Sequence, residues 1–269
     1  MKLGYIDYLN CYPFYFRMFE KQTVNGIRIY PGYPCMLNRM MTDRQLDMSP
    51  ISSATCAEIA EDVMVLPQFC LSSVGYVGSV ILVSKIPIED LNQKRVGITS
   101  ASHTSEVLLK VLLKRFYNLE PVYIPTQPRP VLKDMDAALV IGNDAMAISS
   151  EPIPYIYDLG DLWLRKTGFP VVFAVFVVRK NVVEEYSSQI KSVVSSYHRS
   201  LDCLEKEREE VVSKARAKYP DIIYDINSYF DLLQFKFDGK LKKALMFYYT
   251  LAGEMGLLKK VTRLNYLDK

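Results

Sequence analysis

Histidine, glycine-rich nucleotide motifs and paired cysteines are scarce or absent in this 269-residue sequence. The two histidines, His103 and His198, lack the short His-x-x-x-His spacing that zinc sites favour. The five cysteines are widely spaced and include no Cys-x-x-Cys, so we expect free thiols in a reducing compartment and no metal site. Neither a phosphate-binding loop, a dinucleotide fingerprint nor a Gly-x-Ser-x-Gly nucleophile motif occurs, which argues against those chemistries.

Strong charge of one sign and long apolar runs are also missing. The net charge is +3, and no Lys/Arg run alternates with aromatic residues, so we expect no nucleic-acid partner. The longest apolar run, residues 169–178, contains Pro170 and is far shorter than the ~20 residues of a membrane span. No targeting segment follows Met1. We therefore expect a cytoplasmic protein with no membrane association.

Strands that run into polar turns and then into helices dominate the first 180 residues. This repetition predicts an α/β fold with mostly parallel sheets. The sequence also predicts two long buried strands at 77–84 and 171–178, short strands at 63–66 and 71–74, and only helices after Glu184. The two long strands bracket a smaller strand-and-helix block, which indicates two lobes with a ligand cleft between them. We place one lobe at 1–86 with 175–269 and the other at 87–174.

Four polar turns between a strand and a helix are candidates for the ligand site, because ligands bind at the carboxyl edge of open α/β sheets. Free backbone N–H groups and hydroxyls at helix N-termini favour a carboxylate or phosphate, whereas the simpler interpretation of each turn is N-capping. His103 is either a general base, a ligand donor or a capping residue. Several tyrosines near the N-terminus belong to the core or line the cleft. The candidates are Asn10; Ser52 and Ser53; Thr99, Ser102, His103, Thr104 and Ser105; and Asn143 and Asp144.

Several motifs also resemble one enzyme family. They are Gly4-x-x-x-Tyr8-Leu9-Asn10-x-x-Pro13, Leu46-Asp47 with Ile51-Ser52-Ser53, Leu66-Pro67, Ser72-Ser73-x-Gly75-x-Val77-x-Ser79-Val80, Ser102-x-Thr104-Ser105, Ile141-Gly142-x-x-Ala145, Asp158-Leu159-Gly160-x-x-Trp163 and Thr167-Gly168-x-Pro170-x-Val172-Phe173-Ala174. In this order the motifs resemble those of the menaquinone-pathway chorismate dehydratases.

The resemblance implies a type II periplasmic-binding-protein-like fold that acts as an enzyme without metal or organic cofactor. The implied reaction removes water from the small-molecule substrate chorismate to give 3-[(1-carboxyvinyl)oxy]benzoate, the first step of the futalosine route. It also implies that Asn10 and Ser79 belong to the active site. The family often has Asp after Ile-Gly, where this chain has Asn143 followed by Asp144, so either of these side chains could face the ligand.

The resemblance suggests a mechanism in which the hydroxyls of residues 99–105 hold one carboxylate, with Ser52 and Ser53 as a second grip. Asn10 and Ser79 would hydrogen-bond the ring hydroxyl or the side-chain carboxylate, and that carboxylate could itself take the ring proton. Two other functions stay open. One is a non-catalytic small-anion solute-binding protein of the same fold, and the other is the sister dihydroxynaphthoate synthase of the same pathway.

Overall fold

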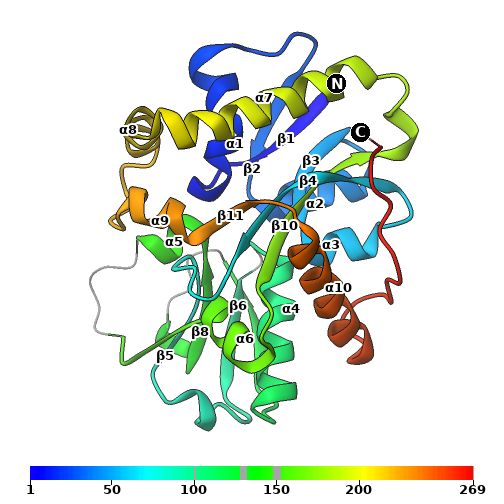
Figure 1. The fold of residues 1–269 in the computed structure, drawn as a ribbon. Coiled ribbons are helices and arrows are strands. Elements are labelled where there is room, and N and C mark those ends of the chain that lie inside the picture. Colours follow the sequence, from blue (N-terminus) through cyan, green and yellow to red (C-terminus); the bar gives the residue numbers. More distant parts are fainter. Residues whose placement is uncertain (100, 128–131, 148–152, 269) are drawn as a thin grey trace.

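Two β-sheets, one in each half of the molecule, carry the fold of the computed structural model, which describes residues 1–99, 101–127, 132–147 and 153–268 (Figure 1). The first sheet has the order β11-β4-β10-β3-β1-β2 and the second the order β7-β6-β8-β5-β9. The first sheet comprises β1 (Lys2–Ile6), β2 (Arg28–Gly32), β3 (Met48–Ser52), β4 (Val63–Ser73), β10 (Val171–Arg179) and β11 (Leu233–Lys236). The second comprises β5 (Val80–Ser84), β6 (Arg95–Thr99), β7 (Val122–Thr126), β8 (Ala137–Ile141) and β9 (Tyr155–Asp158).

Helices cover both sheets. In Figure 1, α7 crosses the first sheet beside α1 and α8, while α4 and α6 lie in the half that holds the second sheet. Helix α10 packs on β10, α3 and α4, and so touches elements of both halves. The helices are α1 (Tyr12–Phe16), α2 (Pro34–Thr42), α3 (Ser53–Glu58), α4 (His103–Val111), α5 (Gly142–Met146), α6 (Leu159–Thr167), α7 (Ser187–Lys206), α8 (Arg208–Lys218), α9 (Ile226–Leu232) and α10 (Gly239–Glu254).

A cluster of buried aromatic rings fastens α1 and α7 to the first sheet. Phe14 of α1 lies 4.4 Å from Phe176 of β10 and 5.5 Å from Tyr197 of α7, measured between ring centroids. Phe69 of β4 lies 5.6 Å from Tyr197. Tilted and edge-on ring pairs of this kind contribute about 0.5–1.5 kcal/mol each beyond their buried area. The cluster therefore packs α1 and α7 tightly on the first sheet. The loop between β1 and α1 is held at both of its ends as a result.

The expected α/β arrangement with two sheet-bearing halves is present, but the sheets are mixed rather than mostly parallel. Strands β1, β2 and β3 pair in parallel, as do β6, β7 and β8. The two strands next to the connections between the sheets, β5 and β10, are antiparallel to both of their neighbours. A strand that has just crossed from the other half enters its sheet from the opposite side, which a purely local pattern of residues does not reveal.

Three strand predictions were wrong in detail. The segment predicted as a strand over 77–84 is a strand only from Val80, because Gly75 and Gly78 adopt φ of +81° and +71° in the crossing before it. The strands predicted at 63–66 and 71–74 are one strand, β4, whose register with β10 shifts between Val65 and Cys70. The region after Glu184 is not wholly helical, because β11 adds an edge strand to the first sheet.

The chain passes between the sheets at residues 74–79 and 159–170. Both passages lie a few residues before the predicted boundaries at 86/87 and 174/175, so β5 belongs to the second sheet and the whole of β10 to the first. The division into lobes at those boundaries stays a prediction.

The two halves meet where the loop after β1 touches the turn after β8. The Leu9 N–H donates to Asn143 Oδ1 at 2.9 Å. Gly142 has φ of +60°, and a Cβ added there would lie 2.5 Å from Cε2 of the Tyr8 ring. The glycine is therefore required twice, once by the backbone conformation and once by the close approach of the tyrosine.

Replacement of Gly142 by alanine should lower the free energy of unfolding by about 2–4 kcal/mol, from the strained φ together with the overlap with Tyr8. Gly168→Ala is the matched control, since Gly168 has φ of +74° and nothing within 4 Å of the added Cβ. The control should lose only about 1 kcal/mol. Urea unfolding of the three proteins measures the difference, and equal losses in the two variants would show that the contact with Tyr8 contributes nothing.

Candidate active site

A small cavity lies between the two sheets, where the loop after β1 faces the turn after β8 and the N-termini of α3 and α4. Its volume is about 50 Å³. The described residues that line it are apolar or neutral and polar: Ile6, Tyr8, Asn10, Pro34, Ser52, Leu71, Val77, Ser79, Val80, Ser102, Ser105, Ile141, Gly142, Phe173, Ala174 and Leu233. Five of the predicted site residues, Asn10, Ser52, Ser79, Ser102 and Ser105, therefore line one cavity, although they come from four separate segments of the chain.

A tyrosine outside the described lining lies next to both Ser79 and Asn10. The Tyr229 hydroxyl, from α9, donates to Ser79 Oγ at 2.8 Å. Asn10 lies close enough to that hydroxyl to lower its pKa, while Asn10 Oδ1 is buried and has no hydrogen-bond partner among the described residues. Burial raises the pKa of Tyr229 far more than these two contacts lower it, so the phenol stays protonated. Unpaired buried acceptors are rare and indicate a strained or ligand-binding position.

The crossing segment that carries Ser79 is held by one carboxylate. Asp158, which caps the N-terminus of α6, accepts the backbone N–H groups of Val77 at 3.1 Å, Gly78 at 2.7 Å and Asp161 at 3.0 Å. Burial raises the pKa of Asp158, and these backbone donors oppose that rise. The Ser79 carbonyl in turn accepts the Gly142 N–H at 2.7 Å. The backbone of Ser79 is thus held on both sides, by the Gly78 N–H before it and by its own carbonyl group.

Three serine hydroxyls of the cavity come from helix N-termini. Ser52 precedes α3, and its Oγ accepts from Asn38 Nδ2 at 2.9 Å. Ser102 caps α4, where its Oγ lies 3.0 Å from Ser105 Oγ and accepts the Ser105 N–H at 3.3 Å. The positive end of a helix dipole and hydroxyls in the same place favour an anionic group such as a carboxylate.

Six predicted site residues are outside the described cavity lining, and the polar atoms of four of them hold neighbouring segments together instead. Ser53 Oγ donates to the Val172 carbonyl at 2.7 Å, and Thr99 Oγ1 accepts the Ala101 N–H at 3.2 Å. Thr104 Oγ1 donates to the Phe173 carbonyl at 2.8 Å and accepts the Ala54 N–H at 3.2 Å.

His103 is the fourth of these residues. Its Nδ1 lies 3.2 Å from Thr55 Oγ1, so this imidazole joins α4 to α3. The cap of α4 is Ser102, and the side chain of His103 bridges two helices instead. Its roles as a general base or a ligand donor stay predictions.

Asn143 and Asp144 follow the cavity residue Gly142 but do not line the cavity themselves. The side chain of Asn143 accepts the Leu9 N–H and so joins the two halves. Asp144 is 8% exposed, within the short helix α5. The sequence left open which of the two faces a ligand, and within the described lining neither does.

Sequence reasoning did not find Tyr229, and it treated Gly142 only as part of a motif. Tyr229 lies in a region that reads as surface helix, and nothing local distinguishes it from the other tyrosines. The signal for Gly142 was present, because a glycine straight after a buried strand indicates a turn with positive φ or a close approach.

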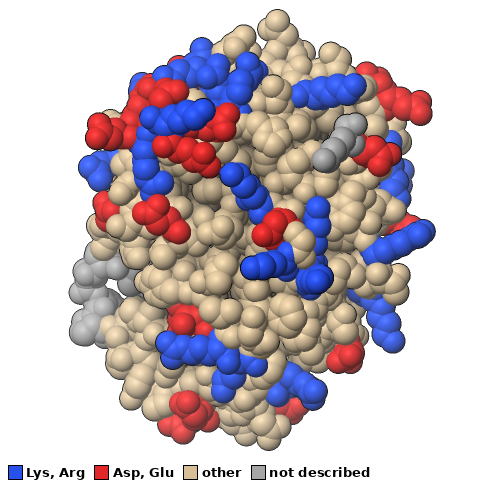
Figure 2. Space-filling view, viewed as in Figure 1, with Lys and Arg blue, Asp and Glu red and all other residues tan. Residues whose placement is uncertain are grey.

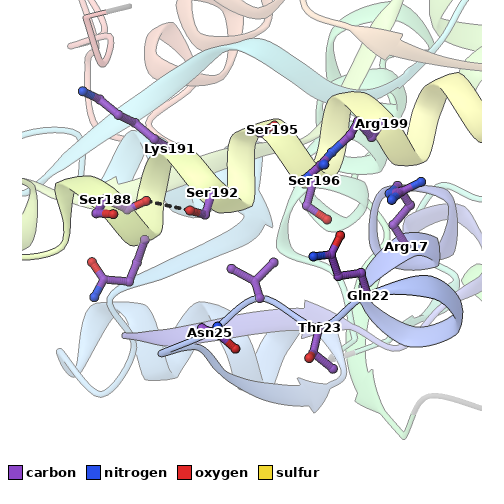
Figure 3. Close-up of a pocket in the computed structure, with 12 residues that line it drawn as sticks. Arg17, Gln22, Thr23, Asn25, Ser188, Lys191, Ser192, Ser195, Ser196 and Arg199 are labelled. Atoms are coloured by element: carbon purple, nitrogen blue, oxygen red, sulfur yellow. Dashed lines mark hydrogen bonds between the residues drawn. The ribbon is translucent and has the colours of Figure 1, made fainter.

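A larger cavity of about 540 Å³ lies elsewhere in the first half, between α7 and residues 22–25. Figure 3 shows Ser188, Ser192 and Ser196 on the helix above Thr23 and Asn25, with Arg17 and Arg199 at one end. It contains none of the predicted site residues, and most of its side chains are exposed. Its size alone does not make it the functional site, because binding sites need convergent buried polar groups.

The outer surface shows no area of a single charge on the face in Figure 2, where Lys and Arg lie beside Asp and Glu. Around α8, Lys21 contacts Glu207 at 3.2 Å and Glu210 at 2.7 Å, and Lys214 contacts Glu20 at 3.1 Å. Among the residues that the structure describes, no group of three His, Cys, Asp or Glu side chains could hold a metal ion. None of the described helices combines the length and the apolar character needed to cross a membrane.

A family model for menaquinone biosynthesis matches residues 1–254. The chain belongs to this family. The expected family resemblance is thus confirmed at the level of the pathway.

Two relatives from Thermus thermophilus share part of the chain. A chorismate dehydratase is 29% identical over 174 residues, which are 58% of this chain and 63% of the relative. A 1,4-dihydroxy-6-naphtoate synthase is 23% identical over 184 residues, 67% of this chain and 65% of the relative. The match therefore spans about two thirds of the length of each relative.

Solved structures show the same fold at low identity. A protein from Archaeoglobus fulgidus, AF1704, superposes with a TM-score of 0.80 at 16% identity over 96% of this chain and 98% of that one. The alkanesulfonate-binding protein SsuA from Xanthomonas axonopodis pv. citri superposes with a TM-score of 0.65 at 14% identity, over 97% and 94%. The predicted periplasmic-binding-protein-like fold is confirmed.

The bridging role of His103 has a consequence for stability. Burial lowers the pKa of His103 from its usual 6.5, outweighing Glu106 and Glu58, which raise it. The folded protein therefore keeps this imidazole neutral at pH values where the unfolded chain binds a proton. The free energy of unfolding should then fall as the pH drops below about 6.5, and stop falling once His103 is also protonated in the folded state.

Replacement of His103 by glutamine removes this proton linkage, so the variant should lose less stability than the wild type between pH 7 and pH 5. Denaturant unfolding across this pH range measures the slopes. Identical slopes for His103→Gln and the wild type would show that His103 is not held neutral by burial.

Proposed function

We propose that this protein is a chorismate dehydratase, a hydro-lyase that converts chorismate to 3-[(1-carboxyvinyl)oxy]benzoate and water. The observation that carries the proposal is the meeting of Asn10 and Ser79, the two residues that the family resemblance assigns to the active site, in one cavity between the sheets. They are 69 positions apart in the chain and belong to different sides of the cleft. Membership of the menaquinone biosynthesis family and the chorismate dehydratase relative support the same reaction.

The chemistry of the cavity suits a substrate that carries two carboxylates on a compact ring. Ser102 and Ser105 at the N-terminus of α4 form one candidate carboxylate grip, and Ser52 at the N-terminus of α3 forms a second. Leu71, Phe173 and the other apolar lining residues would pack against the ring. Ser53, Thr99, His103 and Thr104 would support these grips from outside the cavity.

The reaction needs little from the protein beyond placement. Loss of the ring hydroxyl and of a neighbouring ring proton forms an aromatic ring, which drives the elimination. The described cavity lining holds no Asp, Glu, Lys, Arg or His that could act as a base. The enolpyruvyl carboxylate of the substrate itself can take the ring proton, while Asn10 and Ser79 hold the departing hydroxyl in line. The proton and the hydroxyl together leave as water.

The two halves must separate to admit this substrate. A cavity of about 50 Å³ is well below the ~300 Å³ of a typical small-molecule site. The contacts that would open are those of Tyr8 with Gly142 and of Leu9 with Asn143. Closure over the substrate excludes water and brings Asn10 toward Ser79, in the manner of two-lobed proteins that bind between their lobes.

Two other functions predict different results when the protein is incubated with chorismate. A solute-binding protein, the function that the name of the SsuA relative states for that protein, would bind chorismate and release it unchanged. The sister synthase would act on a cyclic futalosine derivative and not on chorismate. We expect the site of that enzyme to contain a histidine, and the described cavity lining here contains none.

Incubation of the purified protein with chorismate should yield 3-[(1-carboxyvinyl)oxy]benzoate, because the cavity holds the groups that a dehydration requires. Ultraviolet spectroscopy follows the loss of the cyclohexadiene, and mass spectrometry identifies the product. Binding without turnover would favour the solute-binding alternative. Turnover of a cyclic futalosine derivative in place of chorismate would favour the synthase.

Asn10→Ala and Ser79→Ala should each lower kcat by about 100-fold, the loss typical of a hydrogen bond made in the transition state. His103→Ala should stay within about threefold of the wild type, because its side chain bridges α3 and α4 outside the cavity. Circular dichroism and thermal unfolding check that each variant is folded. Full activity of the first two variants, or loss confined to His103→Ala, would contradict this assignment of the site.

A further inference from the structure

We propose that Tyr229 is a positioning residue that makes Asn10 and Ser79 a matched acceptor and donor, and that this pair binds a hydroxyl group of the substrate rather than a carboxylate. The inference deepens the proposed function and rests on it. It comes from the order of the hydrogen bonds among three neutral side chains, one on each of three separate segments of the chain.

The direction of the first hydrogen bond settles the others. The Tyr229 side chain is 0% exposed, and its hydroxyl donates to Ser79 Oγ at 2.8 Å. A tyrosine hydroxyl has one proton, so its oxygen can only accept from its other neighbour. The Asn10 side chain lies beside this oxygen, where it lowers the pKa of Tyr229, and Asn10 Oδ1 is buried without a partner. Only the NH₂ group of Asn10 can donate to that oxygen, so in the proposed order the NH₂ group faces Tyr229 and Oδ1 faces the other way.

In this arrangement Asn10 is left with a hydrogen-bond acceptor and Ser79 with a hydrogen-bond donor. Asn10 Oδ1 is buried without a partner, so it offers an acceptor. Ser79 Oγ already accepts from Tyr229, so its own proton is free to be donated. Both residues line the cavity, while Tyr229 lies behind them. A ligand in the cavity therefore meets one acceptor and one donor in the same lining.

A hydroxyl group satisfies such a pair, because it donates one hydrogen bond and accepts another. A carboxylate does not, since it only accepts and would leave Asn10 Oδ1 unpaired beside a negative charge, a costly arrangement in a buried site. Of the two substrate groups that Asn10 and Ser79 could hold, the pair selects the ring hydroxyl. Ser79 then donates to the oxygen whose bond to the ring carbon breaks, and Asn10 accepts the proton of the same hydroxyl.

Tyr229→Phe removes the hydroxyl and keeps the ring, so it tests the proposal with little change in packing. Tyr197→Phe is the matched control, since Tyr197 is also 0% exposed and its hydroxyl donates to Tyr15, away from the cavity. With chorismate as substrate, Tyr229→Phe should lower kcat by about tenfold or more while KM changes less than about twofold. Tyr197→Phe should keep the wild-type kcat, whatever its loss of thermal stability.

The double variant Tyr229→Phe with Ser79→Ala adds a second kinetic test. Because Tyr229 acts through Ser79 and Asn10 together, Tyr229→Phe should cost a smaller factor in kcat in the Ser79→Ala background than in the wild type. A kcat for Tyr229→Phe within about twofold of the wild type, or losses that multiply in the double variant, would overturn the proposal.

A readout that does not depend on turnover separates this proposal from the proposed function. In ¹⁵N-labelled protein the Asn10 NH₂ signals are identified by their loss in Asn10→Ala. They should shift in Tyr229→Phe and stay in place in Tyr197→Phe. If the wild type leaves chorismate unchanged but these signals shift, the proposed function fails and the hydrogen-bond order stands. If the signals do not respond to Tyr229→Phe, the order itself is wrong.

Discussion

The carboxylate of Asp158 fixes the place where the chain leaves one half of the molecule for the other. It is 7% exposed and accepts backbone N–H groups from both the crossing segment and the start of α6. Hydrogen bonds to a charged acceptor contribute about 1.5–3 kcal/mol each, enough to hold two glycines with positive φ in a fixed turn. Ser79 follows that turn directly. The cavity therefore depends on a buried charge that never touches it.

The packed aromatic cluster behind the first sheet and the hydrogen-bonded segment between the sheets bring three distant parts of the chain together. The aromatic cluster around Phe14 anchors the base of the loop that carries Asn10, and Asp158 anchors Ser79. Helix α9 then supplies Tyr229 from the C-terminal third of the chain. Each anchor is made of groups that are satisfied without a ligand, whereas Asn10 Oδ1 is left unpaired. This contrast between a satisfied scaffold and one unsatisfied acceptor is typical of a prepared binding site.

Local signals in the sequence predicted most of the elements but not the path between the sheets. The sequence predicts a helix at 240–255 and a strand at 137–141, and the structure has α10 at Gly239–Glu254 and β8 at Ala137–Ile141. Both predictions succeed because the periodicity and the end signals are strong there. The strand predicted from Val77 fails because β-branched residues there follow a turn that Asp158 imposes from 80 positions away.

The sequence also predicted part of the candidate site correctly. Asn10, Ser79 and three serines of the polar turns do line one cavity, whereas Thr104 and His103 use their polar atoms to join α4 to its neighbours. Tyr229 could not be predicted, because its role follows only from the packing of α9 against the crossing.

The cavity is lined by amide, hydroxyl and apolar groups, and in its described lining no side chain has an ordinary pKa between about 4 and 8. Such a surface does not change its own charge across the physiological range, and the salt concentration has no charge within it to screen. A change in pH would affect binding at this site mainly by changing the ionisation of the ligand and the stability of the fold. A protein built in this way can work over a range of pH and ionic strength without retuning the groups that meet its ligand.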